Sequence, residues 1–349
     1  MNDRKTNEGG LIPRLSRGEI YYHLRSRLPR DFDSLLARSR ESRPRAEAER
    51  VIAGGVITLS TICVRNCLYC GFRAQESDRM RFRLSRGEVM SAGELAARSG
   101  LQWLILKAGE DPGLSPELVS ELVRELRARF DLHITLSLGE RPGSALANWK
   151  NAGVRSYLLR HETCDPNLYH QIRPSMFWVD RLHTLALIKE QGLELATGLL
   201  LGAPNQSSEG LVEDLLLFLD SAIFCALIEP FAPPPGSPGA ELISRPENRI
   251  LQPDIIMEKV IAIARILRPE LLIPLDNAHF RSFNPLGDGT LFRAGANGLI
   301  FDFTPVAFSA LDAQTPFVGV PISKPEEINR FRAGLQELGL KLEFTPPVQ

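Results

Sequence analysis

Val56-Ile-Thr-Leu-Ser-Thr-Ile62 runs directly into Cys63-Val-Arg-Asn-Cys67-Leu-Tyr-Cys70, so that a short apolar segment opens into a cysteine-rich loop. Runs rich in β-branched residues and leucine predict buried strands. From here onward such runs alternate with longer amphipathic stretches, as repeated βα units do. Eight candidate strands lie near residues 56–62, 103–107, 133–138, 156–160, 194–201, 223–231, 271–275 and 298–303. Eight such units predict an α/β fold, a (β/α)8 TIM barrel.

Helical periodicity fills the intervals between these strands. Helices are expected at 116–130, 178–190, 210–219, 254–267 and 325–338, several of them introduced by Ser, Pro or Asp. The proline-rich segment 230–246 is expected to be a loop above the sixth strand, because the βα rhythm resumes after it. The sequence therefore predicts one barrel domain over residues 51–349.

Residues 1–50 differ in composition from the predicted barrel. They are rich in arginine and glutamate, and Ile20, Leu24 and Leu28 fall on one helical stripe, with two further leucines after them. We expect this segment to form an N-terminal helical lid or collar.

Charge and composition limit the classes of molecule that the protein is expected to bind. Lys and Arg total 41 against 42 Asp and Glu among 349 residues, so the formal net charge of -1 gives no global field that would attract nucleic acid or an anionic membrane. The polar N-terminus lacks a secretory apolar stretch, and no later apolar run has the length of a membrane span. We expect a cytoplasmic protein whose partner is a small molecule.

The cysteines predict a metal centre. The chain has five, an odd number, and three crowd into the eight residues 63–70, which suits metal-bound thiolates in a reducing compartment better than disulfides. Structural zinc normally takes four protein ligands, and no fourth Cys or His lies nearby at zinc-finger spacing. An iron-sulfur cubane held by three thiolates keeps one iron open for a ligand such as a methionine amino and carboxylate group. A zinc loop or a chance cluster of core cysteines is the alternative.

The spacing Cys-x3-Cys-x2-Cys at Cys63, Cys67 and Cys70, with aromatic Tyr69 before the last thiol, resembles the hallmark of the radical SAM superfamily. The resemblance implies a four-iron four-sulfur (4Fe-4S) cluster and S-adenosyl-L-methionine (SAM) as cofactors, with Tyr69 near the adenine. It also implies reductive cleavage of SAM to a 5'-deoxyadenosyl radical, and an external electron donor such as flavodoxin or ferredoxin. The cofactor carries the chemistry, and the protein aims it.

The turn after the second strand, Lys107-Ala-Gly109-Glu110-Asp111-Pro112, is a second candidate. Gly109 lets the backbone approach a ligand, and Glu110 offers an acceptor for an ammonium group. The turn is similar to the Gly-Gly-Glu stretch that binds the methionine amine in radical SAM proteins, with Ala108 replacing its first glycine. A solvated turn is the alternative.

Charged residues also end the fourth strand, in Arg160-His-Glu162-Thr. Charges at this end of a barrel strand usually line the active site. The family comparison implies cofactor contacts for Arg160 and Glu162, the latter near the ribose or sulfonium, and a bond from Arg181 to the SAM carboxylate. Ser137 fits as a hydroxyl donor or as an ordinary serine at a strand end. The alternative for Arg160 and Glu162 is that they pair with each other.

Longer segments resemble the FeFe-hydrogenase maturase of the HydE type. They are Asn66-Cys-Leu-Tyr-Cys-Gly71, Arg81-Phe-Arg-Leu-Ser85, Gly109-Glu-Asp-Pro112, Thr135-Leu-Ser-Leu-Gly-Glu140, Tyr157-Leu-Leu-Arg-His-Glu-Thr163 and Gly295-Ala-Asn297. Methylornithine synthase and biotin synthase are more distant relatives of the same group. The resemblance implies a HydE-like enzyme, or a methylornithine-synthase-like amino-acid mutase as the alternative.

Several positions depart from the maturase pattern where substrate contacts are expected. Lys107 stands in place of a Gln, Glu229 in place of a Gly, and Asp276 and Asn277 in place of small hydroxyl residues; Asp111 is a further substrate candidate. Carboxylates here would repel an anionic iron-cyanide complex and favour an ammonium-bearing substrate, such as an amino-acid-like molecule. The alternative is that Glu229 and Asp276 pair with Arg or Lys.

The two remaining cysteines, Cys164 and Cys225, are too few for an auxiliary cluster and are more simply small buried hydrophobes. A non-catalytic iron-sulfur carrier or scaffold is the alternative of another class. A carrier needs four protein ligands for a closed cluster, which argues against it.

Overall fold

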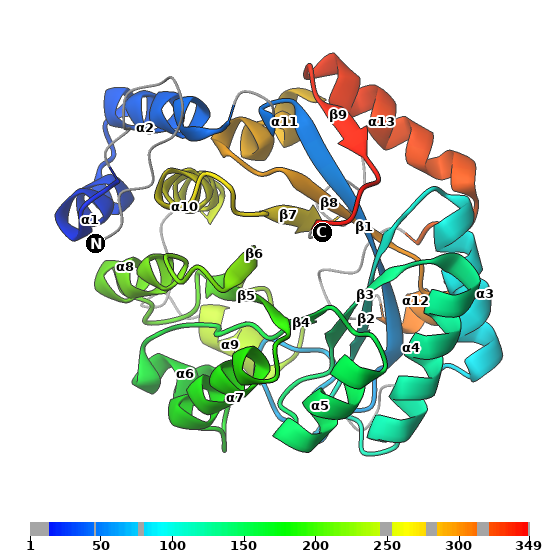
Figure 1. Ribbon diagram of the computed structural model, residues 1–349. Coiled ribbons are helices and arrows are strands. Elements are labelled where there is room, and N and C mark those ends of the chain that lie inside the picture. The colour runs from blue at the N-terminus through cyan, green and yellow to red at the C-terminus, as the bar shows by residue number, and fades with distance from the viewer. Residues whose placement is uncertain are drawn as a thin grey trace.

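The computed structural model describes residues 14–44, 47–75, 80–244, 253–276, 285–312 and 321–347. Within these segments, parallel strands form a barrel and helices surround it (Figure 1). The barrel strands are β1 Arg50–Ser60, β2 Trp103–Ala108, β3 His133–Ser137, β4 Ser156–Leu158, β5 Glu194–Leu201, β6 Ile223–Pro230, β7 Pro274–Asp276 and β8 Gly298–Asp302. The predicted (β/α)8 TIM barrel is confirmed.

The strand order is β6-β5-β4-β3-β2-β1-β8-β7, and every paired neighbour runs parallel. The ring closes between β6 and β7 at a single bridge, Cys225 with Leu272, where Ala226 N donates to Leu272 O at 2.8 Å. This bridge lies below the short β7, so the two strands are joined near their N-terminal ends. The cavity mouth lies at the opposite, C-terminal ends of the strands.

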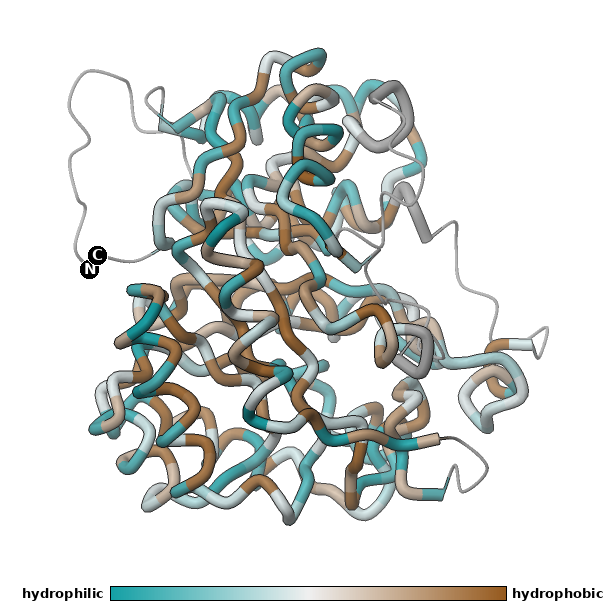
Figure 2. The backbone as a smooth tube through the Cα atoms, turned by 90° about the vertical axis from the view of Figure 1, so that its right-hand side faces the viewer, coloured by the Kyte–Doolittle hydropathy of each residue, from teal (hydrophilic) through white to brown (hydrophobic). Residues whose placement is uncertain are grey.

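Helices follow the strands as expected for βα units. Their bounds are α1 Arg17–Arg25, α2 Pro29–Ser42, α3 Arg86–Arg98, α4 Pro116–Phe130, α5 Gly143–Asn151, α6 Pro166–Ile172, α7 Trp178–Glu190, α8 Ser208–Leu217, α9 Pro238–Ser244, α10 Pro253–Leu267, α11 Pro285–Ala294, α12 Val306–Asp312, the 3-10 turn Pro325–Glu327 and α13 Ile328–Glu337. Hydrophobic residues follow the central strands in Figure 2. Among the described helices, none has the length and apolar character needed to cross a bilayer.

Small and large side chains interlock inside the barrel. Gly54 of β1 faces Trp103 of β2, and a Cβ at Gly54 would lie 2.5 Å from the indole ring, so only glycine permits this approach. An interior cluster that includes Val56, Ile105 and Ile300 fills the space between the strands. This apolar packing forms the floor of the cavity above it.

The N-terminal helices pack against the outside of the barrel, where α1 contacts α8 and α10, and α2 contacts α10 and α11 (Figure 1). Ser16 caps α1 reciprocally with Glu19, and Ile20 and Leu24 are buried. Leu28 does not share their stripe, because it precedes α2 and is 47% exposed. The collar as a unit separate from residues 51–349 stays a proposal.

Several element bounds differ from the sequence-based expectation. Strand β1 begins at Arg50 rather than residue 56, because Gly54 and Gly55 belong to the strand despite their weak strand preference. The loop above β6 contains the helix α9, and an unpredicted strand, β9 Lys341–Glu343, pairs with β1. None of these differences moves the C-terminal strand ends that carry the candidate site.

Candidate active site

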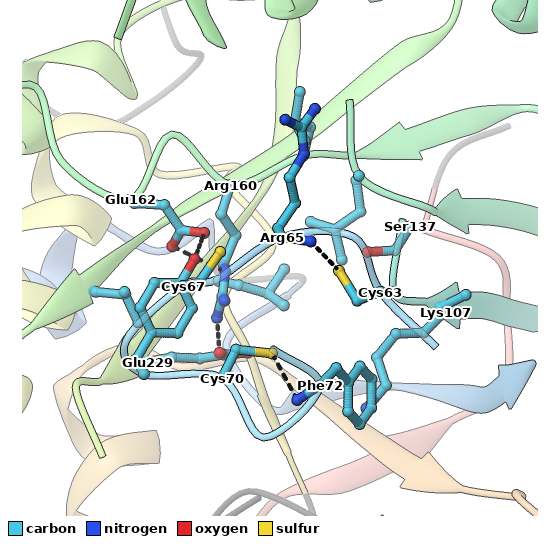
Figure 3. Close-up of a pocket in the computed structure, with 18 of the residues that line it drawn as sticks. Cys63, Arg65, Cys67, Cys70, Phe72, Lys107, Ser137, Arg160, Glu162 and Glu229 are labelled. Atoms are coloured by element: carbon cyan, nitrogen blue, oxygen red, sulfur yellow. Dashed lines mark hydrogen bonds and ion pairs between the residues drawn. The ribbon is translucent and has the colours of Figure 1, made fainter. Parts of the chain in front are cut away.

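A cavity of about 270 Å³ opens at the C-terminal ends of the strands. It brings together thirteen predicted site residues from six strands, the loops after them and helix α7 (Figure 3). They are Cys63, Cys67, Tyr69, Cys70, Lys107, Gly109, Glu110, Ser137, Arg160, Glu162, Arg181, Glu229 and Asp276. Asn277 lies outside the described residues.

The three clustered cysteines lie on the loop after β1, which folds back over the cavity. Cys63 Sγ accepts hydrogen bonds from the backbone N–H of Arg65 (3.4 Å) and of Glu110 (3.3 Å), and Cys70 Sγ accepts one from Phe72 (3.4 Å). Backbone donors aimed at sulfur favour the thiolate form. The loop is therefore shaped to present sulfur as a ligand.

Burial works against a free thiolate at the same positions. It raises the pKa of Cys63, and it raises the pKa of Cys70 to about 12. A bound metal centre reverses this balance because it deprotonates its thiol ligands. Cys67 is buried, and Cys63 and Cys70 are partly buried with backbone donors at their sulfurs. Among the described residues that line the cavity there is no further Cys or His, so the three thiols fit a 4Fe-4S cluster that has one open iron.

Gly109 places the end of β2 against the cysteine loop. A Cβ there would lie 2.3 Å from Ile62 O and 2.7 Å from Cys63 Cβ, so only glycine permits the approach. The next residue, Glu110, is buried; its carboxylate accepts from Arg65 Nε at 2.7 Å and from Glu140 N at 3.2 Å. The turn is thus a packed part of the cavity wall and not a solvated turn.

Glu162 is the most enclosed carboxylate of the cavity. Its Oε1 accepts from Tyr69 O–H at 2.6 Å and from Arg173 Nη1 at 3.0 Å, and Arg173 also donates to the Tyr69 oxygen at 2.9 Å. Glu162 has a left-handed φ of 68°, which turns it out of the β4 direction. Burial alone would raise the pKa of Glu162, but Arg160, Arg173 and Arg181 hold it below its usual range, so it is a carboxylate.

Arg160 bridges two carboxylates across the cavity. Its Nε lies 3.2 Å from Glu162 Oε2, and its other end forms an ion pair with Glu229 from β6 (Figure 3). Its guanidinium also lies over the Tyr69 ring, 5.6 Å from the centroid. The structure therefore contains both pairs that were considered as alternatives, Arg160 with Glu162 and Glu229 with an arginine. Glu229 is thus not an unpaired carboxylate that would bind an ammonium group.

Arg181 reaches the cavity from α7 and is buried. Its Nε donates to Glu140 at 2.8 Å and to Tyr169 O–H at 3.1 Å, and its Nη1 donates to Arg160 O at 2.5 Å. Its Nη2 is buried without a hydrogen-bond partner within the described segments, whereas Glu162 Oε2, which also has no hydrogen bond there, forms the ion pair with Arg160 Nε. A buried donor left open on the cavity wall fits a ligand carboxylate, such as that of the methionine end of SAM.

Ser137 and Lys107 lie side by side, because they are register partners at the ends of β3 and β2. Lys107 Nζ lies 5.9 Å from the centroid of the Phe72 ring. Asp276, half-buried at the end of β7, contributes a carboxylate from the other side of β1 and β8. The cavity lining thus includes side chains of both charges, with Lys107 beside Phe72 at the end of the cysteine loop.

Asp111 requires a correction, because it does not line the cavity. Its side chain is fully buried, accepts from Arg83 Nε and Nη2 at 2.8 and 2.7 Å, and accepts from Ser60 O–H at 2.6 Å. Neighbouring residues of this tight turn point in opposite directions, so Glu110 faces the cavity and Asp111 faces away. Asp111 fixes the turn rather than touching a ligand.

Sequence reasoning missed four residues that hold the predicted ones in place: Arg65, Glu140, Tyr169 and Arg173. Arg65 lies between Cys63 and Cys67, and a charged residue inside a ligand motif is a signal that could have identified it. The others lie beyond the predicted strand ends, and no local pattern marks them. Cys225 is buried among apolar side chains as predicted, but Cys164 is only partly buried and lies beside Asp214, which corrects the expectation for it.

Comparison with known proteins places the chain in a family. The model of the Radical SAM superfamily matches residues 57–218, which include the cysteine loop and the ends of β1–β5. The FeFe hydrogenase maturase subunit HydE of Thermotoga maritima is 33% identical over 279 residues, which are 80% of this chain and 78% of that protein.

Two further relatives agree. The 3-methylornithine synthase of Methanosarcina acetivorans is 28% identical over 246 residues, 70% of this chain and 68% of that protein. The crystal structure of the methylornithine synthase PylB has a TM-score of 0.79 at 22% identity and covers 95% of each chain, which shows a shared fold. The chain therefore belongs to the radical SAM superfamily.

Proposed function

We propose that this enzyme reductively cleaves SAM and directs the resulting 5'-deoxyadenosyl radical at a small polar substrate held in the barrel, as a HydE-like maturase or a paralogue with an altered substrate pocket. One observation carries the proposal: the three thiols and the polar residues Glu162 and Arg181 face one enclosed cavity. When bound, the 4Fe-4S cluster supplies the electron for this cleavage. Its external source is a flavodoxin- or ferredoxin-like donor.

The side chains divide into binding tasks. Arg181 Nη2 is oriented to bind the SAM carboxylate, because its other nitrogens are held by Glu140, Tyr169 and the Arg160 carbonyl. Glu162 binds on the ribose or sulfonium side, where its negative charge suits the cation. Tyr69 lies near the adenine, and Glu110 accepts from the methionine amine. The apolar floor below excludes water from the reacting atoms.

The substrate is expected to carry both charges. Lys107 and Asp276 bring one cationic and one anionic side chain to the cavity lining, and Arg160 forms an ion pair with Glu229 there. The sequence suggested two carboxylates, Glu229 and Asp276, as partners for a cationic substrate. Because Glu229 pairs with Arg160, the cavity offers such a substrate one carboxylate fewer. We infer an amino-acid-like dipolar molecule, which also keeps a methylornithine-synthase-like mutase as the second candidate.

The first test is product detection. The anaerobically reconstituted and reduced protein should release 5'-deoxyadenosine from SAM, detected by mass spectrometry, and Cys67→Ala should abolish it. Absence of the product from the intact protein would favour a non-catalytic scaffold or carrier instead.

The second test identifies the substrate. Deuterated amino acids, simple amines and the maturase substrate would be offered separately, and label transfer into 5'-deoxyadenosine would be measured. Transfer from an amino acid supports the dipolar pocket. Turnover of the maturase substrate alone would contradict it and assign the enzyme to hydrogenase maturation.

A further inference from the structure

A second cluster of potential metal ligands lies behind the cavity wall. His161 follows β4, Cys164 lies three residues later, and Asp214 projects from α8. One ligand atom from each lies within 4.8 Å of the other two. His161 and Asp214 are fully buried, and Cys164 is partly exposed. None of the three lines the cavity, although Arg160 and Glu162 on either side of His161 do.

The hydrogen bonds of Thr197 fix the tautomer of His161. Thr197 O–H donates its one proton to Leu159 O at 2.8 Å, so its oxygen must accept from His161 Nδ1 at 3.2 Å. Nδ1 therefore carries the ring proton, and Nε2 has a free lone pair. Orientation of one imidazole nitrogen by a hydrogen bond at the other is the usual arrangement of a metal-binding histidine.

That lone pair faces a carboxylate. His161 Nε2 lies 3.7 Å from Asp214 Oδ1, which is too far for a hydrogen bond. Within the described residues, Nε2 and Asp214 Oδ2 both lack hydrogen-bond partners. Asp214 Oδ1, the oxygen nearer to Nε2, accepts from Cys164 N–H. A buried acceptor without a donor on each of two neighbouring side chains is costly, and a cation bound by both side chains removes the cost.

The two side chains lie in the protein interior, because His161 and Asp214 are both fully buried. The Phe218 ring packs edge-on against His161 with centroids 5.8 Å apart, so the surroundings are apolar.

We propose that His161 Nε2, Cys164 Sγ and the Asp214 carboxylate form a binding site for a divalent transition-metal ion of zinc-like character, distinct from the iron-sulfur loop. Nitrogen, sulfur and oxygen donors together suit a borderline ion such as Zn²⁺. Bonds of about 2.0–2.3 Å in tetrahedral geometry place ligand atoms about 3.5 Å apart. The observed 3.7 Å between nitrogen and oxygen is close to that value.

Charge and access are consistent with this assignment. The Cys164 thiol releases its proton to solvent on binding, so one thiolate and one carboxylate balance the 2+ ion. The partly exposed Cys164 provides the entry path, and a water entering there would complete the four ligands. The ion would tie the end of β4 to α8, and thereby position Arg160 and Glu162 in the cavity.

The test uses the full-length, cluster-loaded protein under anaerobic conditions. It is equilibrated with Zn²⁺, freed of excess metal by gel filtration, and its zinc and iron are quantified by mass spectrometry. We expect one zinc per chain in the wild type and in the matched control Cys225→Ala, whose thiol is buried away from the site. Cys164→Ala and Asp214→Asn should reduce zinc to background while iron stays constant.

Zinc-edge X-ray absorption then locates the ion without interference from iron. One sulfur neighbour, lost in Cys164→Ala, supports the site; three sulfur neighbours would place zinc on the cysteine loop and overturn it. Wild-type protein without zinc, or zinc retained in both variants, overturns it as well. Asp214→Asn keeps the acceptor for Cys164 N–H, so it tests the site even if another variant folds poorly. These readouts are independent of SAM cleavage.

Discussion

The two sides of the cavity differ in how their charges are held. On the side formed by the cysteine loop and the ends of β2–β4, buried side chains hold one another, as in the set Tyr69, Glu162 and Arg173. On the side formed by β6 and β7, the Glu229 side chain is 27% exposed, and its arginine partner comes from the opposite side.

The difference indicates which side is organised before a ligand binds. Charged groups buried in a connected network keep their geometry without ligand, and this lowers the cost of binding. On the side formed by the cysteine loop, the network keeps the side chains in one geometry, which suits a cofactor that is the same for every substrate. Glu229 and Asp276, two of the departures from the HydE pattern, lie on the β6 and β7 side, whereas a third, Lys107, lies at the end of β2.

The largest expected effect comes from Cys67→Ala, which removes one of the three thiols of the cysteine loop. Iron content and 5'-deoxyadenosine formation should both fall to the limit of detection, because two thiols do not hold the cluster. Cys225→Ala is the matched control and should keep both. Iron and product retained in Cys67→Ala would remove the basis for assigning the cluster to this loop.

Glu162→Gln tests whether the buried network on the side of the cysteine loop matters for SAM binding. The substitution preserves shape but leaves Arg173 without its carboxylate partner and Arg160 with Glu229 alone, so the donors shift. We expect 5'-deoxyadenosine formation to fall on the order of 100-fold, as for an ångström-scale misplacement. If Glu229→Gln reduces SAM cleavage equally, the two sides do not differ in the way described.

The sequence predicted the parts of this site that are encoded locally. Strand ends and the cysteine loop follow from periodicity and from ligand spacing, so Cys63, Glu110 and Glu162 could be placed at one end of the barrel. Glu110 and Asp111 are adjacent, yet one faces the cavity and the other pairs with Arg83. Side-chain direction in a turn depends on backbone angles that composition does not specify.

Contacts between segments that are distant in the sequence could not be predicted. Cys164 and Asp214 are 50 positions apart, and only the packing of α8 against the end of β4 brings them together. Arg173 approaches Glu162 because α6 returns the chain to the cavity. Tertiary packing determines such pairs, and a single sequence gives no signal for them.

Glu229→Gln probes the β6 and β7 side and should have a smaller effect. Losing this carboxylate leaves Arg160 with Glu162 alone, so the cavity gains positive character and should favour more acidic substrates. For a partly exposed pair, the shift in preference is about 1 kcal/mol, or roughly fivefold in kcat/KM between acidic and neutral analogues. An unchanged preference would show that Glu229 acts only on Arg160 and not on the substrate.

Asp111→Asn should have the smallest effect on activity and act mainly on stability. Burial alone would raise the pKa of Asp111, but Arg83, Ser60 and the Gly113 N–H hold it below its usual range. The ionised pair therefore stabilises the fold above the ordinary aspartate pKa of about 4, and this contribution is lost as the pH falls below it. Urea midpoints of the cluster-free full-length chain should show Asp111→Asn less stable by about 1–3 kcal/mol near neutral pH. The gap to the wild type should narrow as the pH falls below about 4; a constant gap would mean that Asp111 contributes through packing and not through its charge.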